Sequence, residues 1–206
     1  MDKIKAAYDI ITHALPLAAF EGWNQATLNK AAALAGYKKT DAIRVFPNGA
    51  IEAVDMYFRM SDAAMLTALQ RYHLDTMKIR ERIATAVRLW LEARENDREA
   101  LRRALALHAQ PQHTLHAVKS LYHTVDEIWH AAGDTSTDFN FYTKRMMLAG
   151  VFSTTLLFWL NDQSPGYVSS WAFLDRRIEN VMQIEKAKYR AKHWFAEVKE
   201  RFSKHG

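Results

Sequence analysis

The chain has 206 residues, of which 49% are hydrophobic and 25% charged, enough apolar material for one globular domain or a small head on a larger body. It contains no cysteine, which excludes a disulfide framework, a thiolate metal site and a cysteine nucleophile. The net charge of +5 is confined to one end, because residues 186–204 carry seven Lys and Arg against two Glu while residues 1–185 are neutral. That distribution favours an anionic partner for the tail rather than for the whole protein.

The start of the chain is typical of a helix rather than of a targeting segment. Residues 1–15 carry charges of both signs and repeat apolar positions every three or four residues, unlike a signal or transit peptide. The longest uncharged apolar run, residues 146–160, is shorter than the roughly twenty residues that a membrane-spanning helix needs. We therefore expect a protein of a bacterial-type cytoplasm without a membrane-spanning helix.

Apolar residues recur every three or four positions along the chain, and no stretch alternates with a period of two. The pattern predicts an all-α fold of about nine or ten helices. Four apolar stripes are expected to face the core. They are Ile4, Tyr8, Ile11, Leu15 and Ala18; Ile79, Ile83, Val87 and Trp90; Leu115, Val118, Tyr122, Val125 and Trp129; and Trp171, Leu174, Ile178 and Val181.

The first sixty residues have the layout of a helix-turn-helix head. After a long helix come a short helix over Thr27–Leu34, a turn at Gly36, a second short helix over Thr40–Val45, and a longer helix from about Ala50. Residues 1–60 are similar to the head of tetracycline-repressor regulators, although three short helices that simply pack together would show the same pattern.

The charges of this head are a weak match to DNA, because phosphate contacts by Lys and Arg supply most of the affinity of a DNA-binding protein. The region offers Lys30, Lys38, Lys39 and Arg44, but Asp41 lies inside the second short helix, whose exposed faces offer no Asn or Gln. We do not expect nucleic acid to be the partner. A ligand-responsive transcriptional regulator remains the alternative function.

A longer resemblance covers residues 129–182. It is carried by the motif "GDTSTDFNFYTKR" at residues 133–145, by Ser164-Pro165, and by a Trp-x-Phe-Leu-x-x-Arg pattern that begins at Trp171. This region resembles the C-terminal body of the ninth coenzyme Q protein family, the lipid-binding accessory proteins of ubiquinone biosynthesis. The head resembles the same family more loosely.

The resemblance implies a dimeric, tetracycline-repressor-like protein in which residues 1–60 form the head and residues 61–184 form a body with a ligand chamber. The chamber would hold an isoprenoid or quinone lipid and no other cofactor, and the protein would present a quinone precursor to the demethoxyubiquinone hydroxylase. The resemblance also implies a partner-binding surface, where this chain has Phe141 in place of the Trp common in the family. Its expected residues are Ile128, Asp138, Phe141, Tyr142 and Arg145.

The helix expected over Tyr142–Leu160 has apolar residues on more than one face, as the wall of a lipid chamber would require. An ordinary core helix would show the same pattern. The expected lipid-binding residues are Leu148, Val151, Phe152, Thr155, Leu156 and Trp159. Small residues at Gly150, Ser153 and Thr154 would permit close helix packing, which suggests a dimer seam.

The tail, residues 185–206, predicts an amphipathic helix with aromatic side chains on one face and basic side chains on the others. Such a helix is expected to bind an anionic membrane surface. Its membrane-binding residues would be Lys188, Lys192, Trp194, Phe195, Val198 and Phe202. A solvated helix folded back on the body, or a nucleic-acid contact, are the alternatives. We expect a peripheral protein of the bacterial inner membrane, or of the matrix side of the mitochondrial inner membrane in a eukaryote.

Histidines raise a last hypothesis, a metal-dependent enzyme. His116, His123 and His130 repeat every seven residues, and Glu127 precedes His130 by three, as in half of a carboxylate di-iron motif. Such bundles use two Glu-x-x-His motifs, and the sequence has no second one. It also has no glycine-rich phosphate loop and no nucleophile–base signature. We therefore expect neither a metal site nor enzymatic activity.

Overall fold

The structure is a computed structural model that describes residues 2–134, 139–181 and 183. From the sequence, Thr137 or Asp138 is also the expected cap of the helix that follows the motif at residues 133–145. Both residues and the expected tail helix of residues 185–206 lie outside the described residues.

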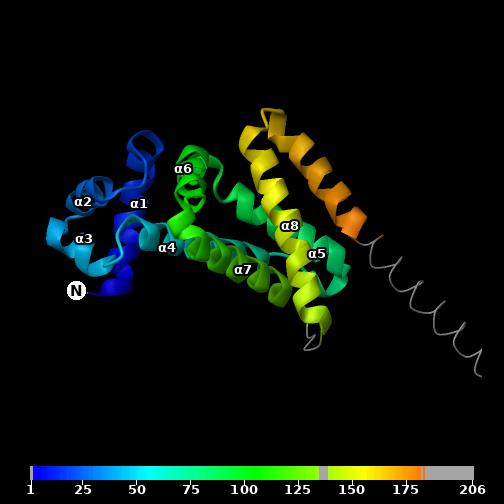
Figure 1. Ribbon diagram of the computed structural model, residues 1–206. Helices are drawn as coiled ribbons and strands as arrows, with labels where there is room; N and C mark the ends of the chain where they lie inside the picture. Colours follow the sequence, from blue (N-terminus) through cyan, green and yellow to red (C-terminus); the bar gives the residue numbers. More distant parts are fainter. Residues whose placement is uncertain (1, 135–138, 182, 184–206) are drawn as a thin grey trace, which may run out of the picture. The chain divides into compact units, whose positions relative to one another are not determined.

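The regular secondary structure of the described residues is entirely helical, with no strand among them, which confirms the all-α prediction (Figure 1). Residues 168–181 are helical as well and follow the last short turn. The α-helices are α1 (Lys3–Glu21), α2 (Gln25–Leu34), α3 (Lys39–Val45), α4 (Ala50–Leu69), α5 (Ile79–Glu92), α6 (Arg98–His108), α7 (Thr114–Ala131) and α8 (Phe139–Asn161). Short 3₁₀ turns lie at Leu74–Thr76, Glu95–Asp97, Pro111–His113 and Pro165–Tyr167.

Local signals in the head explain where its helices begin. The Asp2 carboxylate accepts hydrogen bonds from the first free amides of α1, and Asn24 accepts from Thr27 N at 3.0 Å to cap α2. Gly36 has a φ of 81°, a conformation that suits glycine, and it makes the turn between α2 and α3. The helices that the sequence predicts over Thr27–Leu34 and Thr40–Val45 lie within the observed α2 and α3.

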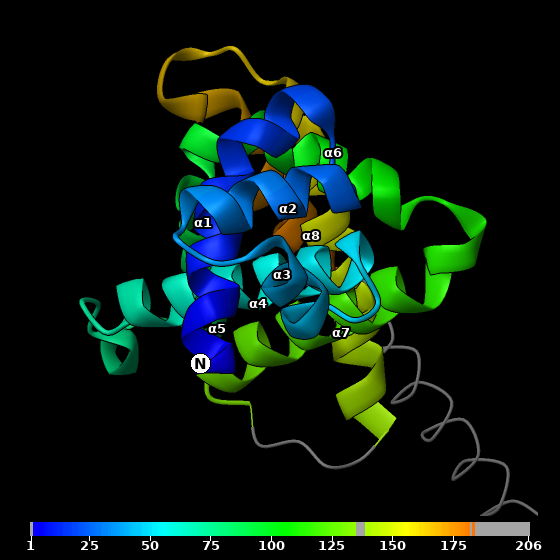
Figure 2. The same ribbon diagram turned by 90° about the vertical axis from the view of Figure 1, so that its left-hand side faces the viewer.

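The chain divides into two compact units, residues 1–152 and residues 153–206, and the division falls inside α8. In the first unit, α1 packs against α2 and α6, and α4 packs against α5 and α7. Figures 1 and 2 both show α1, α2 and α3 grouped together, with α4 and α7 side by side. The division expected at residue 60 falls within α4, a continuous helix that runs from the head into the body.

An aromatic chain fills the core of the first unit. Trp23 lies 5.6 Å from Tyr57 between ring centroids, Tyr57 lies 6.1 Å from Phe58, and Phe58 lies 5.7 Å from Trp90. Trp90 in turn meets Phe152 edge-on at 5.0 Å. These rings come from the connection between α1 and α2, from α4, from α5 and from α8, so burying them joins the head to the body.

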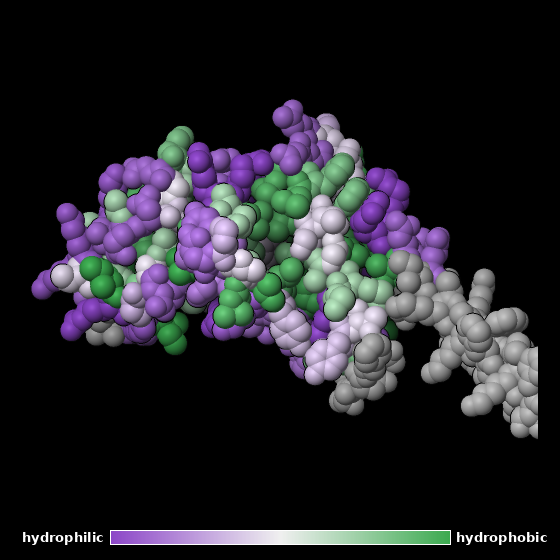
Figure 3. All heavy atoms as spheres, in the orientation of Figure 1, coloured by the Kyte–Doolittle hydropathy of each residue, from purple (hydrophilic) through white to green (hydrophobic). Residues whose placement is uncertain are grey.

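Some of the apolar stripes continue past the core. Ile11, Ala18, Ile83, Val87, Trp90, Val125 and Leu174 are buried as expected, but Ile4, Tyr8, Ile79, Leu115, Val118 and Tyr122 are exposed, so their assignment to the core was wrong. Periodicity identifies the face of a helix but not the point along it where the neighbouring helix ends. Figure 3 shows the same result as green apolar groups that reach the surface among purple polar ones.

In the second unit, one carboxylate organises the connection after α8. Asp162 accepts hydrogen bonds from Ser164 N at 2.8 Å, Ser170 N at 2.9 Å and Ser170 Oγ at 2.6 Å. Beyond that connection Phe173 stacks on Phe158 of α8, with ring centroids 4.6 Å apart. Among the described residues, no helix in either unit is both long enough and apolar enough to cross a bilayer.

Candidate partner-binding site at the start of α8

The corner between α7 and α8 is closed by backbone hydrogen bonds. Gly133 ends α7 with a φ of 86°, and the amide of Asp134 then donates to Trp129 O at 3.1 Å. Arg82 of α5 supports this corner from the side, because its guanidinium donates to Ala132 O at 3.0 Å. The corner is therefore anchored before α8 begins.

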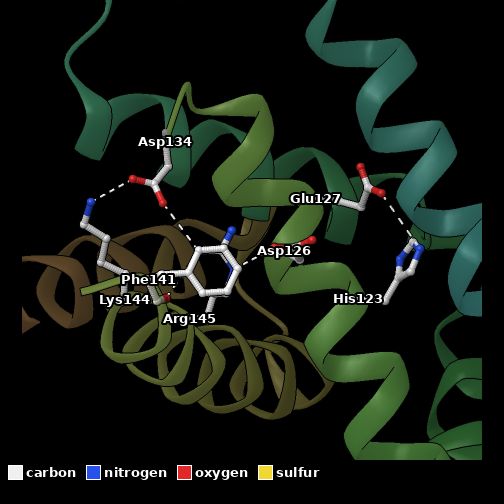
Figure 4. A network of polar contacts seen from close by, with 7 residues as sticks. All are labelled: His123, Asp126, Glu127, Asp134, Phe141, Lys144 and Arg145. Atoms are coloured by element: carbon white, nitrogen blue, oxygen red, sulfur yellow. Dashed lines mark hydrogen bonds and ion pairs between the residues drawn. The ribbon is translucent and has the colours of Figure 1, made fainter. Parts of the chain in front are cut away.

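Arg145 lies at the centre of a charged network that joins α7 to α8 (Figure 4). Its Nε donates to Asp126 Oδ1 of α7 at 2.6 Å, and its Nη1 lies 3.4 Å from Asp134 Oδ2. The Arg145 side chain is only 7% exposed, and the carboxylate of Asp134 is 6% exposed. The buried Arg145 cation is thus paired with two carboxylates, of which Asp134 is buried and Asp126 is 44% exposed. Weakening this pairing should be costly, because a buried charge depends on its partners.

The same arginine stacks on an aromatic ring one helical turn earlier. Its Cζ lies 3.3 Å from the ring centroid of Phe141, which is a close guanidinium–ring contact. The Phe141 ring meets Tyr142 edge-on at 5.2 Å. Tyr142 is 65% exposed and Met146, one turn further along α8, is 76% exposed. The start of α8 thus presents the apolar side chains of Tyr142 and Met146 to solvent, while the ion pairs of Arg145 hold this part of the helix against α7.

Lys144 adds a second cation to this corner. Its Nζ donates to Asp134 Oδ1 at 2.7 Å and lies 5.5 Å from the centroid of the Trp129 indole. Asp134 therefore forms ion pairs with both Lys144 and Arg145, one through each of its carboxylate oxygens (Figure 4).

The expected partner-binding residues occupy different depths. Tyr142 is exposed and Phe141 is half-buried, so both are available to a partner. Ile128 is fully buried and Arg145 nearly so, which places them beneath the surface rather than on it. Asp138 lies outside the described residues.

The sequence analysis did not identify Asp126 and Asp134 as the residues that hold this surface. Their only signal was two acidic residues ahead of the basic pair Lys144-Arg145, and nothing in the local pattern tells which acid meets which base. Nor does the pattern show that Met146, the first residue of the uncharged apolar run 146–160, is exposed.

The repeating histidines meet a matching repeat of aspartates on α4. Asp55 lies 3.1 Å from His108 Nε2 and 2.5 Å from His116 Nδ1, and it accepts from Ser120 Oγ at 2.9 Å. Burial acts to raise the pKa of Asp55, but the hydrogen bonds from His108, His116 and Ser120 outweigh it and lower the pKa.

Asp62, two turns along α4, makes the corresponding contact with α7. It accepts from Trp90 Nε1 at 2.8 Å and Thr124 Oγ1 at 2.8 Å, and His123 Nδ1 lies 3.0 Å from its other oxygen. Burial raises the pKa of Asp62, and these hydrogen bonds offset that effect only in part. Since residues 55 and 62 meet residues 116 and 123 in the same order, α4 and α7 run in parallel.

No cluster of three side chains suited to hold a metal ion occurs in the described parts of the chain. A pocket of ≈ 580 Å³ opens over the contact between α4 and α7. It is lined by Asp55, Phe58, Arg59, Asp62, His116, Val118, Lys119, Ser120, Tyr122, His123 and Asp126, most of which carry a polar or charged group. A smaller pocket of ≈ 250 Å³ lies nearer the head, against Lys3, Phe46 and Met56.

The expected lipid-binding residues are all buried in this structure. Leu148, Val151, Phe152, Thr155, Leu156 and Trp159 are each 5% exposed or less. Neither of the two pockets described above is lined by any of them. Thr155 also has a buried hydroxyl oxygen for which no hydrogen-bond partner is found. The expected membrane-binding residues of the tail lie outside the described residues.

Comparison with known proteins gives one family. The family model COQ9 matches residues 114–185, which include α7, the α7–α8 corner and α8. The chain is 30% identical to the mitochondrial ubiquinone biosynthesis protein COQ9 of Drosophila melanogaster over 189 residues, which is 90% of this chain and 57% of that protein. It is 45% identical to the same-named mitochondrial protein of Rattus norvegicus over 82 residues, which is 40% of this chain and 26% of that protein.

A solved structure matches the fold. The TetR transcriptional regulator from Nitrosomonas europaea ATCC 19718 superposes with a TM-score of 0.67 over 84% of this chain and 95% of that one, at 21% identity. At that identity the likeness shows the fold alone, and it confirms the expected tetracycline-repressor-like architecture. The chain spans little more than half of the fly protein and about a quarter of the rat protein.

Proposed function

Because the chain belongs to the COQ9 family of ubiquinone biosynthesis proteins, we propose that it is a non-enzymatic accessory protein of that pathway. The observation that carries the proposal is the match over residues 114–185, the region in which the exposed Tyr142 and the half-buried Phe141 lie against the ion pairs of Arg145. The related proteins are named as biosynthesis proteins and not as enzymes.

The proposed task is to bind an isoprenoid or quinone precursor and to present it to the demethoxyubiquinone hydroxylase. The apolar side chains of α8 that include Leu148, Phe152 and Leu156 supply a wall that a hydrocarbon chain can contact. Because these side chains are buried, a lipid would have to displace their present neighbours, so binding requires that the interior open. Such a lipid would gain about 25 cal/mol for each Å² of apolar surface that it buries.

The hydroxylase is proposed to bind the start of α8. Tyr142 and Met146 offer exposed apolar area on one side of the helix. Aromatic side chains of this kind are enriched among residues that dominate binding energy at interfaces. We further propose that the protein acts as a homodimer at an anionic membrane surface, which the basic tail would contact.

The lipid is tested by purifying the full chain from native membranes and extracting it with organic solvent. Mass spectrometry should recover an isoprenoid or quinone compound in stoichiometric amount. A variant with Leu156→Trp, which places extra volume in the proposed wall, should carry less lipid at unchanged expression. Recovery of no lipid from either protein would contradict the carrier role.

The hydroxylase contact is tested by substituting the aromatic pair. Replacing Phe141 and Tyr142 with alanine should weaken hydroxylase binding by about a hundredfold, since two interface aromatic residues are removed. The midpoint of thermal unfolding should stay within a few degrees of wild type, because Tyr142 is exposed. A large loss of stability at unchanged affinity would show that the pair is part of the core.

A ligand-responsive transcriptional regulator is the second candidate, favoured by the fold match alone. The head gives it little support, because the cation of Lys30 is paired with Glu21 at 2.8 Å and Asp41 lies beside Arg44 at 3.9 Å. A selection from random DNA that returned one palindrome, bound with steep salt dependence, would favour this function over the first. If the selection enriches no DNA sequence, the function as a transcriptional regulator is excluded.

A further inference from the structure

The contacts at the start of α8 lead from the proposed partner surface to a single buried side chain. We propose that Arg145 is a positioning residue, which holds the ring of Phe141 in place and so orients the aromatic pair for the hydroxylase partner. The inference rests on the proposed function, in which the pair binds that enzyme. It assigns to Arg145 a role without direct contact with the partner.

The depth of Arg145 excludes it as a contact residue in this conformation. Its side chain is 7% exposed, whereas Tyr142, three residues earlier, is 65% exposed. The guanidinium is already occupied by Asp126, Asp134 and the carbonyl oxygen of Phe141, the last at 3.3 Å from Nη1. At this depth a partner group cannot reach the guanidinium unless the residues around it move.

Geometry connects the arginine to the exposed surface through Phe141. The guanidinium plane covers the ring of Phe141 at 3.3 Å, and that ring meets Tyr142 edge-on at 5.2 Å. A stacked guanidinium restricts the rotation of an aromatic side chain, which would otherwise exchange between rotamers at the surface. Less side-chain freedom is then lost on binding, and an interface ordered in advance binds more tightly.

The origin of the two carboxylates adds to this argument. Asp126 belongs to α7 and Asp134 to the loop after it, so the guanidinium is held from outside α8 and from two directions (Figure 4). Arg145 is consequently held in place by the body of the first unit. Its guanidinium in turn holds the Phe141 ring, which lies against it. Lysine cannot replace arginine here, because an ammonium group has no plane to stack and cannot serve both carboxylates with the same geometry.

The experiment is a double-mutant cycle on the full chain, with the affinity for purified hydroxylase as its readout. Arg145→Lys, which preserves the charge, should weaken binding about tenfold. Phe141→Ala should weaken it at least as much. The double variant should bind within about twofold of Phe141→Ala, because the arginine has no further effect once its ring is gone. Independent effects that multiply would overturn the positioning role.

Lys144→Gln is the matched control. It removes a cation from the same helix and from the same carboxylate, Asp134, but it leaves the Arg145–Phe141 stack in place. It should change the affinity by less than about threefold and should multiply with Phe141→Ala. A loss as large as that of Arg145→Lys would show that the ion pairs with Asp134, rather than the stack on Phe141, control binding.

A spectroscopic measurement separates this inference from the proposed function. With 4-fluorophenylalanine at position 141, the ¹⁹F resonance of the free protein should shift and broaden in Arg145→Lys but not in Lys144→Gln. An unchanged resonance in Arg145→Lys would overturn the positioning role even if the hydroxylase binds. Absence of hydroxylase binding by the wild-type chain, with the ¹⁹F shift present, would instead overturn the partner assigned under the proposed function.

Discussion

The buried carboxylate of Asp62 on α4 accepts a hydrogen bond from the indole nitrogen of Trp90 on α5, with 2.8 Å between the two atoms. Thr124 of α7 donates to the same oxygen at 2.8 Å, so one acceptor satisfies two buried donors from different helices. Three helices of the first unit are therefore joined at a single polar point inside an aromatic core.

Substitution of Asp62 should destabilise the protein strongly. Asp62→Ala removes the acceptor and leaves the Trp90 and Thr124 donors buried without partners, which should lower the free energy of unfolding by about 3 kcal/mol. Urea denaturation measures the change. Asp75→Ala, which removes an exposed carboxylate, is the control and should cost less than about 0.5 kcal/mol. Equal costs for the two variants would mean that the hydrogen bonds of Asp62 add nothing.

Stability should depend on pH through Asp162. Burial acts to raise the pKa of this carboxyl, but hydrogen bonds from Ser170 and Ser164 outweigh burial and lower its pKa from 3.8 to about 2. Because the folded pKa lies below the unfolded value, the stabilising contribution is complete above about pH 4 and is lost as the pH falls towards 2.

The measurement is the unfolding midpoint of wild type and Asp162→Asn between pH 6 and pH 2. The wild type should be the more stable protein at pH 6, and the two midpoints should converge as pH 2 is approached. A ¹³C titration of the carboxyl group should give its pKa directly. A difference in midpoint that is independent of pH would contradict the expected ionisation.

Two glycines should respond to alanine in opposite ways. Gly133 has a φ of 86°, and an added Cβ would lie 3.1 Å from Arg82 Nη1, so Gly133→Ala should cost about 1–2 kcal/mol. Gly150 lies within α8 with open space around an added Cβ, and Gly150→Ala should stabilise by about 0.5–1 kcal/mol. Thermal unfolding of the two variants checks both signs. Destabilisation by Gly150→Ala would point to a close contact there, as a dimer seam would provide.

The basic tail should control membrane binding. Deletion of residues 186–206 should reduce binding to vesicles that contain anionic lipid and should leave the folded body intact, since each basic residue near the surface contributes up to about 1 kcal/mol. Sedimentation with vesicles of neutral and of anionic composition measures the effect. Replacing Trp194 and Phe195 with alanine, at constant charge, separates insertion of the aromatic rings from attraction by charge. Unchanged binding after the deletion would assign the tail another role.

Much of the fold followed from patterns that are local in the sequence. A 3.6-residue period and the glycine after the second helix were sufficient to predict α2 and α3 within two residues at each end. These signals are readable because helix formation depends on neighbours three or four positions away. The motif at residues 133–145 likewise indicated the family, through residue types at fixed spacing.

The extent of the core could not be read in the same way. Leu115, Val118 and Tyr122 continue the stripe that buries Val125, yet they are exposed, because no helix among the described residues covers them. The apolar residues would recur every three or four positions whether that end of the stripe were buried or exposed. Burial depends on which elements meet, and that is decided by contacts distant in the sequence.

By itself, the sequence determined an all-helical chain, its early helix boundaries, the position of the basic tail and the family. Only the tertiary structure decided that His116 and His123 meet Asp55 and Asp62, and that Arg145 lies beneath the aromatic pair instead of at the surface. The physical reason is that an ion pair forms between side chains that packing brings within about 4 Å, and local spacing carries no information about partners from another helix.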